Sequence, residues 1–68
     1  MAYRLMASGP SGDRSAGEAY ERPMAIRMAE QLARTDPGED LTTYRVVDWR
    51  ENVIFEVSND GQPGKELR

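Results

Sequence analysis

The sequence predicts an α+β domain in which one amphipathic helix packs on an antiparallel sheet of three or four strands, in a ββαββ or βαββ order. Three observations lead to this prediction. Apolar and polar side chains alternate near the start of the chain, a pattern with helical period follows, and a second alternating stretch has the form of a β-hairpin. With 68 residues the chain makes one domain, which we place at residues 1–58, followed by a polar, mobile tail over 59–68.

The first strand is expected over 2–8, because Tyr3, Leu5 and Ala7 alternate with charged or flexible side chains. Residues 8–17 hold three glycines, three serines and a proline, a composition typical of turns and loops. The stretch 16–21 is equally compatible with a short second strand, in which Tyr20 would be the one large anchor, and with a loop.

The helix is expected to begin at Pro23, where a missing N–H is tolerated, and to run to Arg34 or Thr35. Asp36-Pro37-Gly38 then ends it. At 100° per residue its apolar side chains share one face. They are Ala25, Ile26, Met28, Ala29, Leu32 and Ala33. The three alanines would allow the helix to approach the sheet closely.

The stretch 42–58 predicts a hairpin with a four-residue loop over 49–52. This register places Asp48 opposite Val53, Val46 opposite Phe55, Tyr44 opposite Val57 and Arg45 opposite Glu56. A two-residue turn would instead mix apolar and charged groups on both faces of the hairpin. Trp49 is therefore expected at the hairpin tip.

One sheet face would be covered by the helix, which leaves the other face open. The register assigns six side chains to this face: Arg4, Met6, Arg45, Val47, Ile54 and Glu56. The apolar members Met6, Val47 and Ile54 indicate either a face that meets another copy or the ordinary preference of such residues for strands.

Composition limits the possible functions. The chain has no cysteine and no histidine, which excludes disulfides, thiolate or histidine metal ligands, and thiol or histidine catalysis. The formal net charge of −3 disfavours nucleic-acid binding. No apolar run is long enough to span a membrane and the start lacks a signal-peptide pattern, so we expect a cytoplasmic protein without cofactor.

The remaining candidates for chemistry are weak. Glu18 and Glu21 could approach one another, and 36–40 holds three acidic residues, but neither spacing resembles a glycosidase pair or a calcium loop. The glycine-rich stretch lacks the lysine and adjoining helix of a phosphate-binding loop. It is read as a hairpin connection, or as an adaptable contact loop with Arg14 as its reaching group. We expect no enzyme activity.

Trp49 is the strongest candidate for a binding residue, because it is the only tryptophan and lies beside Arg50, and these two types dominate binding hot spots. It could also fold back and belong to the core of so small a domain. The partner-binding prediction is Trp49, Arg50 and Glu51 at the tip, together with Arg14.

The helix PMAIRMAEQLA followed by YRVVD and NVIFEV resembles small stand-alone bacterial and phage proteins of ββαββ layout, among them some anti-CRISPR inhibitors. The resemblance covers residues 23–57 and carries over no site residue. It implies a non-enzymatic, phage- or mobile-element-encoded protein that occupies a surface of a larger protein or complex. The alternative prediction is a homo-oligomer, such as a homodimer, assembled through the open sheet face or an edge strand.

Overall fold

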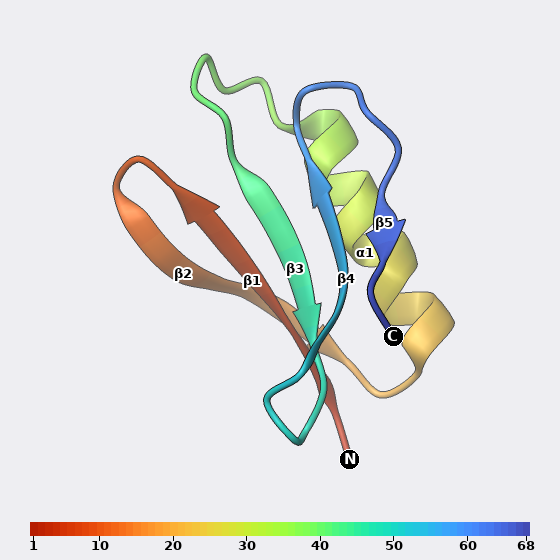
Figure 1. Ribbon diagram of the computed structural model, residues 1–68. Coiled ribbons are helices and arrows are strands. Elements are labelled where there is room, and N and C mark those ends of the chain that lie inside the picture. The colour runs from red at the N-terminus through yellow and green to blue at the C-terminus, as the bar shows by residue number, and fades with distance from the viewer.

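A computed structural model describes residues 1–68 as one helix packed on one face of a five-stranded antiparallel sheet (Figure 1). The elements are β1 (Tyr3–Gly9), β2 (Gly12–Ala19), α1 (Arg22–Thr35), β3 (Thr43–Val47), β4 (Val53–Ser58) and β5 (Lys65–Glu66). The strand order is β2-β1-β3-β4-β5. The α+β class predicted from the sequence is confirmed, with five strands where three or four were expected.

The first hairpin is longer than the sequence indicated. β2 starts at Gly12 and not at residue 16, so most of the stretch read as a loop pairs with β1, and only Pro10 and Ser11 separate the strands. Gly12 has a φ of 104°, which a residue with a side chain rarely adopts. Backbone hydrogen bonds to β1 hold this segment in the sheet despite its poor strand propensity. Tyr20 follows the strand and is 76% exposed, so the expectation that it anchors β2 is wrong.

The helix matches its prediction closely. It begins one residue before Pro23 and ends at Thr35. Ala25, Ala29 and Ala33 are buried against the sheet, while the larger apolar side chains of the same face pack at its sides and are half-buried. Small side chains along the contact allow the helix axis to approach the strands, as the spacing predicted.

The central hairpin keeps the predicted register only up to Val46. Tyr44 faces Val57, Arg45 faces Glu56 and Val46 faces Phe55, as expected. A β-bulge then shifts the pairing so that Val47, and not Asp48, faces Val53.

The bulge adds one residue to β4 and moves Ile54 into the buried core. Ile54 is 3% exposed and packs in the same cluster as the helix alanines. The sequence assigned Ile54 to the open face as a possible oligomer contact. This assignment is wrong, because strict alternation of side chains cannot reveal a bulge.

The last ten residues, 59–68, return to the domain and contact it. Lys65 and Glu66 form β5 on the edge of β4, and the Leu67 N–H donates to the Ile54 carbonyl at 2.9 Å. Arg22 contacts the carbonyl of Arg68. The domain thus includes residues that the sequence assigned to a tail, because strand pairing between two residues leaves almost no pattern in the sequence.

Gly64 is the point where this segment crosses the core, and replacing it by alanine is expected to release β5. A Cβ there would lie 2.2 Å from Cζ of Phe55, whose ring is 4% exposed and cannot withdraw freely. We expect a loss of about 1–3 kcal/mol in the free energy of unfolding, measured by denaturant titration, together with faster amide exchange at Leu67. Gln62→Ala, in the same segment and exposed, is the control. Wild-type stability in Gly64→Ala would contradict this packing.

Candidate functional site

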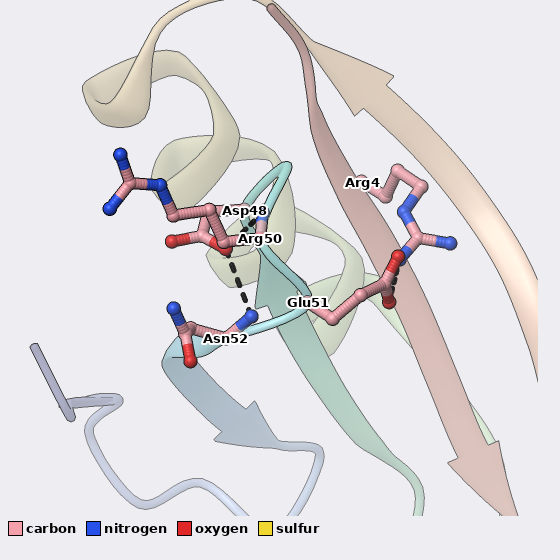
Figure 2. Close-up of polar contacts among 5 residues, drawn as sticks. All are labelled: Arg4, Asp48, Arg50, Glu51 and Asn52. Carbon is pink, nitrogen blue, oxygen red and sulfur yellow. Dashed lines mark hydrogen bonds and ion pairs between the residues drawn. The ribbon is translucent and has the colours of Figure 1, made fainter.

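The loop between β3 and β4 is a compact turn built around one carboxylate. Oδ1 of Asp48 accepts hydrogen bonds from the backbone N–H groups of Arg50, at 2.8 Å, and Asn52, at 2.9 Å (Figure 2). The Asp48 N–H donates to the Asn52 carbonyl at 2.9 Å, and the Asp48 carbonyl accepts from the Glu51 N–H at 3.1 Å. These four bonds hold Trp49 and Arg50 at the tip on a backbone that is fixed at both ends.

Glu51 occupies the strained position of this turn. Its φ is 65°, the only positive value at a residue other than glycine, and its carboxylate forms an ion pair with Arg4 of β1 (Figure 2). The left-handed conformation closes the turn, and the ion pair ties the loop to the neighbouring strand. Tip and sheet therefore form one surface.

Glu51→Gly is expected to stabilise the domain by about 0.5 kcal/mol, because relief of the left-handed strain, about 1–2 kcal/mol, exceeds the lost exposed ion pair and the added chain entropy of glycine. Glu51→Gln keeps the strain and removes only the charge, so it should be neutral or slightly destabilising. Denaturant midpoints of the two variants provide the comparison. A lower midpoint for Glu51→Gly than for Glu51→Gln would show that the ion pair outweighs the strain.

The loop is expected to loosen only in strong acid. The N–H groups of Asn52 and Arg50 bond the ionised carboxylate and hold the pKa of Asp48 below its ordinary value of 3.8. A lowered folded pKa means that Asp48 stabilises the fold above pH 3.8 and that this contribution is lost as the pH falls through the folded pKa. The amide resonance of Asn52 should report this transition, and Asp48→Asn should abolish it. A transition at or above pH 3.8 would contradict the turn geometry.

Trp49 is partly packed against the domain and partly exposed, so each of the two sequence interpretations, core residue and binding residue, applies to one part of its side chain. Its ring packs edge to face against Tyr3, with centroids 5.3 Å apart and an interplanar angle of 71°, yet the residue is 46% exposed. The contact with Tyr3 fixes the orientation of the indole, and the other half of the side chain faces outward. An aromatic side chain held in this way loses little conformational freedom when it binds a partner.

Further apolar side chains gather at the same end of the molecule, where the N-terminus, the β3–β4 loop and the start of α1 lie together (Figure 1). Met1 precedes β1, and Leu67 is held beside the start of β4 by its bond to Ile54. Tyr20 and Met24 lie where β2 passes into α1. Of the six large apolar residues that are exposed, only Leu41 lies elsewhere, in the connection that leads into β3 at the opposite end. We call the surface formed by Met1, Tyr3, Trp49, Arg50, Glu51 and Leu67 the hairpin end.

Sequence reasoning found Trp49, Arg50 and Glu51 but missed Met1, Tyr3 and Leu67. Tyr3 was assigned to the first strand, and Leu67 to a tail. The strand order places the start of β1 and the residue after β5 near the tip. No local signal in the sequence announces that these segments converge.

Arg14 does not join this surface. It lies on β2 opposite Ala7, toward the other end of the sheet, and not on a mobile loop. Its charge acts instead on Tyr44 and Asp36, whose side chains share a hydrogen bond of 2.8 Å. The Gly38 N–H and the Tyr44 hydroxyl, with a smaller effect of Arg14, lower the pKa of Asp36. Arg14 is thus placed beside the end of the helix, far along the strand from the tip.

The open sheet face is more polar than the sequence predicted, since Ile54 has left it. Arg45 bonds the Ser8 hydroxyl at 2.7 Å and pairs with Glu56 at 3.5 Å, and the hydroxyls of Thr43 and Ser58 are 2.8 Å apart. Met6 and Val47 are the apolar members that stay on this face, and Val47 is buried within the chain, with only 8% of its surface exposed. Most polar groups here are satisfied within the chain.

The two sheet edges are also poorly suited to strand pairing. β2 carries a bulge and charged side chains, and β5 has only two residues, which are devices that discourage edge-to-edge association. These features weaken the case for a homo-oligomer formed through the open face or an edge strand.

The acidic residues considered for chemistry form no cluster of metal-ligating side chains. No group of three or more carboxylates that could hold a metal ion is formed. No helix has the length and apolar character needed to cross a membrane.

The hairpin end is therefore the surface at which exposed aromatic, arginine and aliphatic side chains coincide, and its interpretation rests on this chain alone. No protein-family model, curated protein or solved structure matches it.

Proposed function

We propose that this protein is a non-enzymatic binding module that docks its hairpin end onto a surface of a larger protein. The observation that carries the proposal is Trp49, a half-exposed indole fixed on Tyr3 at the tip of a tightly hydrogen-bonded turn. Rigid, partly exposed aromatic side chains next to arginine have the composition of a binding hot spot.

The surroundings of Trp49 fit this role. Arg50 projects from the same turn with a backbone fixed by Asp48, so that its guanidinium can pair with an acidic group of a partner. Met1 and Leu67 are 83% and 43% exposed and add apolar surface at the same end of the molecule. A partner would thus meet an apolar centre with charged groups at its border, the usual anatomy of a protein interface.

Affinity capture tests the proposal. The tagged protein, its Trp49→Ala variant and its Leu41→Ala variant are each immobilised and exposed to lysate of the cells that encode the chain. We expect one protein to be retained in stoichiometric amount by the wild type and by Leu41→Ala, and to be lost from Trp49→Ala. Leu41 is the matched control, because it is an apolar residue of similar exposure at the opposite end. Equal retention by all three proteins would refute docking through the hairpin end.

A further inference from the structure

A second apolar surface, made of residues outside the hairpin end, lies between β2 and α1. The helix packs mainly over β3 and β4, so its side toward β2 is only partly covered (Figure 1). Two adjacent grooves open there. One is lined in part by Ala16, Arg27, Met28 and Leu32, and the other by Glu18, Tyr20, Glu21, Met24 and Met28. We call this surface the β2–α1 flank.

Two large apolar side chains of the flank are exposed, and a third is half-buried. Tyr20 is 76% exposed and Met24 is 47% exposed, and Met28, which lines both grooves, is half-buried between them. Methionine side chains adapt to irregular partners and make favourable contacts with aromatic rings. Exposed apolar side chains that lie together in this way can be covered by a second surface.

The charges on the flank favour another copy of the same surface. Glu21 immediately precedes α1, Arg27 lies six residues further on, and Met24 lies midway between them in the sequence. A two-fold axis beside Met24 would run the two helices antiparallel. It would place Arg27 against the partner's Glu21 and Met28 against the partner's Tyr20, so that every charged contact is made twice.

We propose that two copies of the chain associate through their β2–α1 flanks about this axis. The contact is between side chains of the helices and not between strands, because the bulge and charges of β2 hinder the pairing of one β2 with another. The hairpin end takes no part in the contact, and Trp49 lies outside both grooves.

Light scattering on the size-separated protein tests the proposal through charge reversal. The wild type should have twice the monomer mass of 7.7 kDa. Arg27→Glu and Glu21→Arg should each halve the observed mass, since each variant brings like charges together at both contacts. The double variant, Arg27→Glu with Glu21→Arg, should restore the dimer mass because the pair is re-formed with its signs exchanged.

Two controls separate this outcome from a general effect of charge or folding. Arg34→Glu makes the same change of charge on the exposed side of α1 away from the flank and should stay dimeric. Far-UV circular dichroism spectra of all variants should match that of the wild type, because the altered side chains are exposed and outside the core. A wild type that is monomeric at every concentration overturns the proposal, as does a dimer that persists in Arg27→Glu and Glu21→Arg.

Discussion

Leu5→Ala is expected to unfold a large fraction of the molecules at room temperature. Leu5 is fully buried on β1, beside Val46 and beneath the helix, and is one of the two largest side chains with no exposure. Truncating such a leucine costs about 2–5 kcal/mol, since the transfer energy is lost and a cavity remains. A single core of this size rarely supplies more than about 3–5 kcal/mol in total.

Leu41→Ala is the matched control for this prediction, because the same atoms are removed from a residue that is 61% exposed. Its effect on stability should stay within about 0.5 kcal/mol. Denaturant titration followed by circular dichroism gives both values. A small loss in Leu5→Ala would mean that the thin layer between sheet and helix can close around a cavity, and would contradict the close approach provided by the alanines of α1.

Trp49→Ala is expected to separate binding from stability. The edge-to-face contact with Tyr3 is worth about 0.5–1.5 kcal/mol, so the melting temperature should fall only modestly. A hot-spot tryptophan contributes at least about 2 kcal/mol to binding, which corresponds to a loss of affinity of about 30-fold. Trp49→Phe, which keeps an aromatic ring against Tyr3, should recover most of the stability and part of the affinity.

The sequence determined those parts of the fold that depend on side-chain periodicity. Alternation in β1 and in the β3–β4 hairpin, and the alanine spacing of α1, placed these elements within one or two residues of their observed bounds. Trp49 was placed at a tip for the same reason, since the register of Val46 and Phe55 fixes where the strands must end.

The remaining parts depend on the backbone and on tertiary context. β2 is rich in glycine, serine and charged residues, and is held mainly by its ladder to β1, with Ala19 as its one buried residue. β5 has only two residues. The bulge at Ile54 breaks the alternation that the prediction had to assume. The full extent of the hairpin end also escaped prediction, because Met1, Tyr3 and Leu67 join its tip residues only when the start of β1, the β3–β4 loop and the C-terminal residues are brought together.

The same distinction explains the two errors in the proposed sites. Arg14 looked mobile because its neighbours favour turns, yet pairing of β2 fixes it beside Tyr44 and Asp36. Ile54 looked open because alternation put it there, yet the extra residue of the bulge turns it into the core. In both cases hydrogen bonding between strands, and not the local sequence pattern, determines where the side chain lies.

The central claim is that the exposed part of the Trp49 side chain binds a partner protein. The most direct measurement is titration calorimetry of the captured partner against the wild type, Trp49→Ala and Leu41→Ala, with melting curves of the same preparations. We predict a loss of affinity of about 30-fold or more for Trp49→Ala alone, with a melting temperature close to that of the wild type. Unchanged affinity in Trp49→Ala, accompanied by a large fall in its melting temperature, would show that the indole belongs to the core and would contradict the claim.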